Sequence, residues 1–384
     1  MQWKYRLSDI DYGLEEQQAV LAVLKSKWLS MGEQTKRFEE AVGLYVGAQS
    51  VAVSSCTAAL HLALKTIDIG PGDEVIVPSY TFIATVNSIR YQGATPVFVD
   101  IGGPHDLNMD SSQLQGLLTE RTRAIMPVHI AGYATNIEEV VRFARDNGLW
   151  VVEDAAHAIG SSYSGRLLGT FGDVGCYSFF ANKNLVTGEG GMLVTNNMEI
   201  LERARVLRTQ GIATTSLDKA TRSSKATRSS AEYDVYELGH NYLMTEIHAA
   251  LGICQLSKLE KNNQKRRRLT QRYRENLSGE SYATIPFLGN QTHSSCHIFP
   301  VILSRDVNRD EVINRLDEQG VQTSIHYPPV HSFSLYVRTI NRSLPRTEDV
   351  SRREITLPLH PLLRKKDIDD ICIILKDAVK KSRR

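Results

Sequence analysis

The 384-residue sequence has no closely spaced pair of cysteines, no excess of charge of one sign and no long apolar run. Its five cysteines form no CxxC motif, which argues against a structural zinc site or a disulfide framework and favours a reducing cytoplasm. The 45 basic and 43 acidic residues nearly cancel, which argues against a protein that binds nucleic acid or a membrane surface. No stretch approaches the roughly 18 apolar residues of a membrane span.

Two nucleotide-binding patterns are also missing. No GxGxxG motif follows the first predicted strand, which disfavours a dinucleotide-binding oxidoreductase. The glycine cluster at Gly188, Gly190 and Gly191 lacks the GxxxxGK[ST] spacing and opens a strand, so it is not interpreted as a phosphate loop. At this length we expect a large core with a smaller appended domain.

Short apolar segments rich in Val and Ile recur in the first half of the chain, and stretches of helical spacing separate them. Continuous apolar runs of this kind are typical of strands covered on both faces. They predict an α/β fold with a mostly parallel seven-stranded sheet flanked by helices. The expected strands are 51–53, 75–77, 96–99, 124–128, 150–153, 176–180 and 192–195, and the expected helices between them are 57–65, 84–91 and 137–147.

The pattern changes in the last third, where residues 245–276 are helical and increasingly charged. We expect a large domain over residues 1–255, with an N-terminal segment that packs on the second domain, and a small α+β domain over residues 256–384. The small domain has expected strands at 298–303 and 321–326 and expected helices at 309–319 and 366–380. The tandem hexapeptide KATRSSKATRSS, residues 219–230, lacks apolar periodicity and is interpreted as a mobile loop.

Two motifs follow the first predicted strands. In SSCTAAL, residues 54–60, a strand gives way to a helix, so backbone N–H groups near Thr57 and Ala58 are placed to bind a phosphate. In PSYTFIAT, residues 78–85, Phe82 lies at the edge of the sheet where ligands of open α/β folds bind. An ordinary helix cap and a core aromatic residue are the structural alternatives.

A third motif, VVEDAAHAIG, ends an apolar strand in two carboxylates, Glu153 and Asp154. A buried carboxylate is costly without a cationic partner, and a protonated pyridine ring would be such a partner for Asp154. His157 follows three residues later, across the turn.

The last two motifs supply a lysine and an asparagine. CYSFFANKNLVTGEGGML places Ser178 in a strand and Lys183 in the following turn, where burial would lower the pKa of the amine and make it a nucleophile. LGHNYLMTEIHAALG places Asn241 just before a helix. A surface lysine and a helix-capping asparagine are the alternatives.

In order and spacing these motifs resemble the DegT/StrS family of sugar aminotransferases, which are pyridoxal-phosphate enzymes of fold type I. The resemblance covers nearly the whole chain. It also includes WLSMGEQTKRFEEAVGLYVGA, GDEVIVPSYTFIATVNSIRYQGATPVFVDI, SIHYPPVH and LPLHPLL.

The resemblance implies a role for each residue. Lys183 would bind pyridoxal 5'-phosphate as a Schiff base and move protons, Asp154 would pair with the pyridine nitrogen, and His157 would contact the ring hydroxyl. Phe82 would stack on the ring. Thr57, Ala58 and Ser178 would bind the phosphate, and Asn241 would reach the phosphate of the partner subunit's cofactor in a homodimer with shared sites.

The implied reaction transfers an amino group from an amino acid, commonly glutamate, to a keto sugar attached to a nucleotide, with a 4-keto sugar favoured over a 3-keto sugar. His326 in SIHYPP is the candidate substrate contact, although a histidine that stabilises the turn before two prolines is an equal alternative. Two other functions share the scaffold. A pyridoxal-dependent sugar dehydratase characteristically replaces the lysine with histidine, and a non-catalytic regulator would not need Lys183.

Overall fold

The computed structural model describes residues 3–212, 234–235, 237–337 and 342–383. The hexapeptide repeat at 219–230 therefore lies outside the described residues. None of the described helices is both long and apolar enough to cross a membrane.

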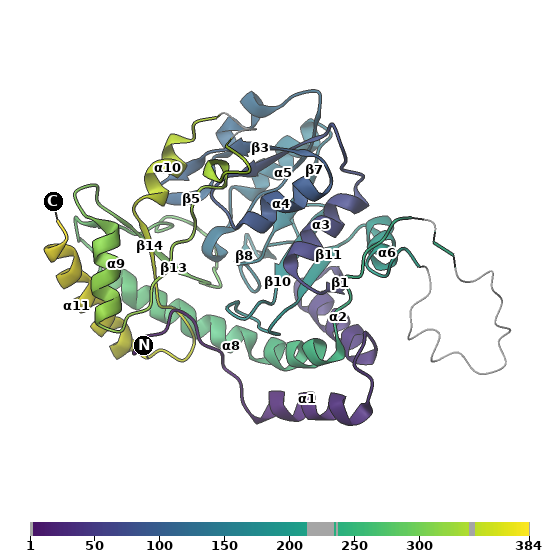
Figure 1. Ribbon diagram of the computed structural model, residues 1–384, viewed down its shortest axis with the longest axis horizontal. Coiled ribbons are helices and arrows are strands. Elements are labelled where there is room, and N and C mark those ends of the chain that lie inside the picture. The colour runs from purple at the N-terminus through teal and green to yellow at the C-terminus, as the bar shows by residue number, and fades with distance from the viewer. Residues whose placement is uncertain (1–2, 213–233, 236, 338–341, 384) are drawn as a thin grey trace.

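The centre of the molecule is a seven-stranded sheet with the order β1-β11-β10-β7-β6-β2-β3 (Figure 1). Strand β11 runs antiparallel to both of its neighbours, and the remaining pairs are parallel. All seven predicted strands are present in this sheet, which confirms the predicted fold class. Their bounds are β1 Gln49–Val53, β2 Glu74–Pro78, β3 Thr95–Val99, β6 Thr122–Ile125, β7 Trp150–Asp154, β10 Val174–Ser178 and β11 Gly191–Thr195.

Helices cover both faces of this sheet because its strands are apolar on both sides. Along β2, Val75 and Val77 contribute to one core while Ile76 contributes to another, as the two-residue alternation of a strand requires. Helix α3 packs against α4, α6, β10 and β11, whereas α5 packs against β6 and β7. The helices of this part are α1 Leu14–Ser26, α2 Glu33–Val46, α3 Cys56–Thr66, α4 Ile83–Tyr91, α5 Ile137–Asp146 and α6 Met198–Leu207.

Helix α8, Glu246–Asn276, is 31 residues long and connects the two ends of the molecule. It contacts α1 and α2 at one end and α11 at the other, and Figure 1 shows it running along the lower side of the molecule. Its N-terminus is capped by the Thr245 hydroxyl, which accepts the backbone N–H of His248 at 3.3 Å.

The C-terminal part has its own three-stranded sheet, with the order β12-β13-β14, and its own apolar core. The N-terminal segment contributes Tyr5 to this core, and the backbone N–H of Tyr5 donates to Gly320 O at 2.9 Å. The elements are β12 Ala283–Thr284, β13 Phe299–Leu303, β14 Glu354–Leu357, α9 Arg309–Glu318, α10 Pro345–Ser351 and α11 Lys365–Lys381. Short elements complete the described chain: β4 Ile101–Gly103, β5 Asp106–Met109, β8 Ser162–Tyr163, β9 Arg166–Leu167, and 3-10 turns at Ser111–Leu117, Ile130–Gly132 and Val330–Ser332.

One expected strand of this part is wrong. Residues 321–326 make only isolated bridges, from Val321 to Tyr5 and from Ser324 to Thr356. The strands at the two edges of this sheet are instead β12 and β14, which the sequence did not indicate. The 321–326 segment lies against two different partners, so it forms no continuous ladder with either.

Candidate active site

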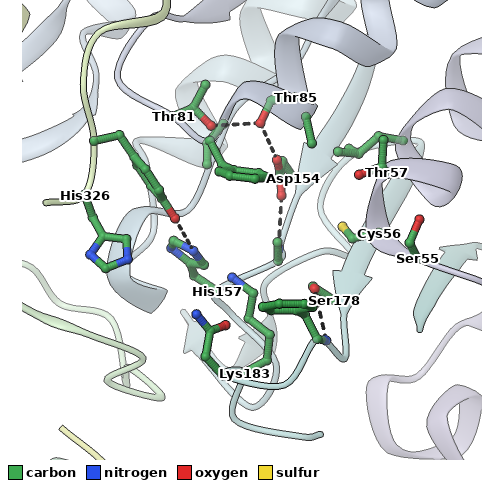
Figure 2. Close-up of a pocket in the computed structure, with 18 of the residues that line it drawn as sticks. Ser55, Cys56, Thr57, Thr81, Thr85, Asp154, His157, Ser178, Lys183 and His326 are labelled. Atoms are coloured by element: carbon green, nitrogen blue, oxygen red, sulfur yellow. Dashed lines mark hydrogen bonds between the residues drawn. The ribbon is translucent and has the colours of Figure 1, made fainter. Parts of the chain in front are cut away.

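A cavity of about 350 Å³ opens where β2, β7 and β10 end. This is the edge of an open α/β sheet at which ligands bind, because the loops after the strands leave a crevice there. Side chains of the C-terminal part, His326 and Tyr327, form its opposite side. Figure 2 shows Asp154, His157, Ser178, Lys183 and His326 around this space.

Lys183 lies in the turn between β10 and β11, and its backbone N–H donates to Phe180 O at 2.9 Å. Burial lowers the pKa of its amine from 10.5 to about 8, and the nearby Cys56 and Asp154 oppose this shift. No side chain of the described residues hydrogen-bonds the amine. A desolvated amine without a partner is a nucleophile near neutral pH.

The two carboxylates at the end of β7 face different surroundings. Glu153 accepts hydrogen bonds from His129 Nε2 at 2.8 Å and from the backbone N–H groups of Gly169 and Gly172. It therefore connects the segments that carry these residues and does not face the cavity. Asp154 lines the cavity. Adjacent residues of a strand point to opposite faces, which separates the structural carboxylate from the one available to a ligand.

Asp154 is held by a chain of hydroxyl groups. Thr85 Oγ1 donates to Asp154 Oδ2 at 2.8 Å, and Thr81 Oγ1 lies 2.8 Å from Thr85 Oγ1. The backbone N–H of Ala156 donates to the other oxygen, Oδ1, at 3.1 Å. Burial raises the pKa of the Asp154 carboxyl, and these bonds together with the charge of Lys183 limit the rise. A cation in the cavity would stabilise the ionised carboxylate further.

The N-terminus of α3 forms another side of the cavity, which Thr57 and Ser178 both line. Ser55 Oγ accepts the backbone N–H of Ala58 at 3.1 Å, and Ala58 does not line the cavity. A Cβ on Gly191 would lie 2.5 Å from the backbone of Ser55, so the close approach of β11 to this turn requires glycine. Hydroxyl groups at the positive end of a helix suit a phosphate.

His157 is fixed between two partners. Its Nε2 lies 2.9 Å from the Tyr327 hydroxyl, and Ala131 N donates to its Nδ1 at 3.4 Å. Burial, assisted by the charge of Lys183, lowers the pKa of His157 well below 6.5, so the ring is neutral. Phe82 lies beside Tyr327, with ring centroids 6.1 Å apart, and remains 57% exposed. An uncovered aromatic face beside the cavity can stack on a planar ring.

The structure brings together most of the predicted site residues but not all of them. Lys183, Asp154, His157, Phe82, Thr57, Ser178 and His326 line one cavity. Asn241 lies outside this cavity, is exposed and forms a backbone bridge with Thr209. Within a single chain it therefore does not contact the proposed cofactor site. Its predicted contact with a partner subunit stays a prediction.

Sequence reasoning missed three groups. Thr81 and Thr85 belong to the quoted PSYTFIAT motif, yet nothing in the motif indicated that their hydroxyls would support Asp154. Tyr327 directly follows His326 in SIHYPP and was passed over. The position of Tyr327 next to His326, a predicted site residue, was the signal that could have identified it.

A desolvated lysine in a turn, a buried carboxylate that forms no ion pair with the described residues, and a helix N-terminus lined by hydroxyl groups match the needs of one cofactor. They offer a covalent attachment point, a partner for a pyridinium nitrogen and a phosphate site, so the residues fit pyridoxal phosphate. Together with the doubly covered sheet, this arrangement defines a fold-type-I pyridoxal-phosphate enzyme.

Comparison with known proteins supplies the family. Residues 11–376 match the model of the DegT/DnrJ/EryC1/StrS aminotransferase family, and the chain belongs to that family. It is 36% identical over 369 residues to GDP-perosamine synthase from Caulobacter vibrioides, which covers 95% of each protein. Members of the family depend on pyridoxal phosphate, and the chain is an aminotransferase of this kind.

Solved structures agree with this assignment. PseC of Helicobacter pylori, an aminotransferase involved in the biosynthesis of pseudoaminic acid, superimposes with a TM-score of 0.90 at 29% identity, covering 99% of this chain and 100% of that one. The PLP form of Spr1654 from Streptococcus pneumoniae gives a TM-score of 0.89 at 29% identity, covering 99% of both chains.

Proposed function

We propose that this protein transfers an amino group from glutamate to a keto sugar attached to a nucleotide, with a 4-keto sugar favoured, and that Lys183 holds pyridoxal phosphate through Nζ. The observation that carries the proposal is the single cavity that joins Lys183 to Asp154, His157 and the hydroxyls at the α3 N-terminus. The Caulobacter relative is a GDP-perosamine synthase and PseC acts in pseudoaminic acid biosynthesis, and both names support a sugar substrate.

When bound, pyridoxal phosphate supplies the electron sink for a carbanion next to the transferred nitrogen. The protein supplies the rest. The Lys183 amine, when it is not bonded to the cofactor, would take the proton from the substrate carbon through Nζ, and its lowered pKa suits this task. Asp154 would stabilise the positive ring nitrogen, and the neutral His157 would face the ring hydroxyl without adding charge, with its Nε2 shared between that hydroxyl and the hydroxyl of Tyr327.

We propose that the cavity lies between a large domain, residues 1–255, and a small domain, residues 256–384. His326 and Tyr327 reach the cavity from the second of these, which supports His326 as the contact to the sugar. Asn241 would complete the phosphate site of the second subunit in a homodimer, since it is exposed outside its own cavity.

The test has two parts. The first is borohydride reduction of the purified yellow protein followed by peptide mapping, for which we expect the label on Lys183. The second is conversion of a panel of nucleotide-linked 3-keto and 4-keto sugars with glutamate, for which we expect ping-pong kinetics. A label on another residue, a sequential kinetic pattern, or no conversion of any keto sugar would contradict the proposal.

A further inference from the structure

Two buried polar side chains, those of Thr356 and Glu354, lie behind the His326 ring. Thr356 Oγ1 lies 2.9 Å from His326 Nδ1 and 2.5 Å from Glu354 Oε1. The second carboxylate oxygen, Oε2, accepts the backbone N–H of His326 at 2.8 Å. Glu354 and Thr356 are both fully buried, and neither lines the cavity that His326 faces.

The strand geometry explains how these groups meet. Glu354 and Thr356 are two residues apart on β14, so their side chains point to the same face. Thr356 and Ser324 exchange two backbone hydrogen bonds, Thr356 N to Ser324 O at 2.8 Å and Ser324 N to Thr356 O at 3.2 Å. Two residues further along this antiparallel contact, His326 lies opposite Glu354. There the Glu354 carboxylate replaces the backbone carbonyl as the acceptor for the His326 N–H.

The line of hydrogen bonds has a direction when Glu354 is ionised. A carboxylate only accepts, so the Thr356 hydroxyl donates to it and its oxygen must accept from His326. The hydrogen of the neutral imidazole then lies on Nδ1, and Nε2 keeps a free lone pair. Burial and the charge of Lys183 lower the pKa of His326 to about 4, so the ring carries only one hydrogen.

We propose that Glu354 is a positioning residue whose ionised form, through the Thr356 hydroxyl, fixes the hydrogen of His326 on Nδ1 and makes Nε2 a hydrogen-bond acceptor toward the cavity. The acceptor would receive a hydroxyl hydrogen of the substrate sugar. The identity of this bound partner, a sugar hydroxyl, rests on the proposed function. The position of the hydrogen on the His326 ring does not.

The relay reverses when Glu354 takes up a proton. A protonated Oε1 donates to Thr356, Thr356 donates to His326 Nδ1, and the imidazole hydrogen moves to Nε2, which becomes a donor. Burial raises the pKa of Glu354 to about 8, while Arg309 opposes the rise. The other titratable groups facing the pair are Tyr80 and Tyr327, both with raised pKa, and Lys183, His157 and His297 around His326. No basic side chain of the described residues forms an ion pair with Glu354.

The decisive variant is Glu354→Gln. The His326 backbone N–H must meet an acceptor, so the glutamine oxygen faces it and the amide NH₂ faces Thr356. Thr356 then has to donate to His326 Nδ1, which fixes the hydrogen on Nε2 at every pH. Selective ¹⁵N labelling of histidine, with His326→Asn used to assign the signal, reports which ring nitrogen is protonated.

We expect the wild-type holoenzyme to show an unprotonated Nε2 well above the pKa of Glu354 and a protonated Nε2 well below it. Glu354→Gln should show a protonated Nε2 throughout. Thr356→Ser, which keeps the hydroxyl, should behave as wild type, and Thr356→Val should lose the pH-linked change. A protonated Nε2 in the wild type at high pH, or the same ring state in wild type and Glu354→Gln, would overturn the proposal.

Kinetics provide the second readout. Glu354→Gln should lower kcat/KM for the keto sugar about tenfold or more at high pH, the usual cost of one unmatched hydrogen bond, and should remove the part of the pH dependence that follows the protonation of Glu354. Thr356→Ser keeps the hydroxyl and should retain both the wild-type kcat/KM and its pH profile. If no keto sugar reacts with the wild type, the proposed function fails while the labelling result still decides the relay. If sugars react and Glu354→Gln matches wild type in kcat/KM and in its pH profile, the substrate role of the acceptor is wrong.

Discussion

The two sides of the cavity are built in different ways. On the sheet side, Asp154, Ser178 and Lys183 lie at or just after the ends of neighbouring strands. On the other side, His326 and Tyr327 come from one segment, which contacts β14 through the backbone bridge between Ser324 and Thr356. The sheet side offers charge and a nucleophile, and the other side offers neutral rings whose hydrogens are set by buried partners. The comparison shows that the sheet side supplies charges complementary to a ligand, whereas the other side supplies hydrogen-bonding groups whose direction is fixed by buried partners.

The largest effect is expected at the nucleophile of the sheet side. Lys183→Ala should lower the transamination rate by about 10⁴-fold or more, because both the attachment point and the base are lost. The rates of both half-reactions and the borohydride label measure this. Lys380→Ala, at an exposed position of α11, is the matched control and should leave both unchanged. Retained covalent labelling in Lys183→Ala would show that another lysine performs the chemistry.

The neighbouring carboxylates at the end of β7 provide the next test. Asp154→Asn removes the partner of a buried cation, which costs about 3 to 5 kcal/mol and corresponds to roughly 10²- to 10⁴-fold in kcat/KM. The visible spectrum of the bound cofactor should also change. Glu153→Gln should instead lower the free energy of unfolding by about 1 to 3 kcal/mol, because it disturbs the bonds to His129 and two backbone N–H groups. If Asp154→Asn mainly lowered the free energy of unfolding and Glu153→Gln mainly lowered kcat/KM, the assignment of Asp154 to the cavity and of Glu153 to the structure would be wrong.

The pKa of Lys183 gives a pH-dependent prediction for the protein freed of cofactor. Reattachment of pyridoxal phosphate needs the uncharged amine, so its rate should rise with pH and level off above about 8. Because the unfolded lysine keeps its proton up to 10.5, the cofactor-free protein should also gain stability between about 8 and 10.5. Stopped-flow absorbance and denaturant titrations measure the two effects. A rate that continues to climb toward 10.5 would mean that the amine is not desolvated.

The smallest of these effects concerns the link between the two sides. Tyr327→Phe deletes the hydroxyl 2.9 Å from His157 Nε2 and removes the protein partner of that buried nitrogen. We expect the free energy of unfolding to fall by about 1 to 3 kcal/mol, the cost of an unpaired buried group, and kcat/KM to fall roughly tenfold because the His157 ring is no longer held. Tyr5→Phe removes a hydroxyl bonded to Asp370, away from the cavity, and serves as the control. Equal losses of kcat/KM in Tyr327→Phe and Tyr5→Phe would argue against a specific role for the contact between His157 and Tyr327.

The sheet side could largely be predicted because its signals are local. A parallel strand buried on both faces reads as a continuous apolar run, and a polar residue directly after such a run lies at the ligand edge. Asp154 and Lys183 carry this signal, Phe82 follows a strand in the same way, and the structure places all three at one cavity. The other side gave a weaker signal. The expected strand at 321–326 was wrong because its backbone partners, Tyr5 and Thr356, are far away in the sequence.

The sequence by itself determined the seven strands, their mostly parallel arrangement and a lysine, a carboxylate and an aromatic residue at strand ends, because strand periodicity and burial are properties of short segments. Only the tertiary structure decided that Glu153 bonds His129 away from the cavity, that Ser55 already occupies the N–H of Ala58, and that Glu354 lies behind His326. Hydrogen-bond partners depend on distances of a few ångströms between segments remote in sequence, and folding alone brings those segments together.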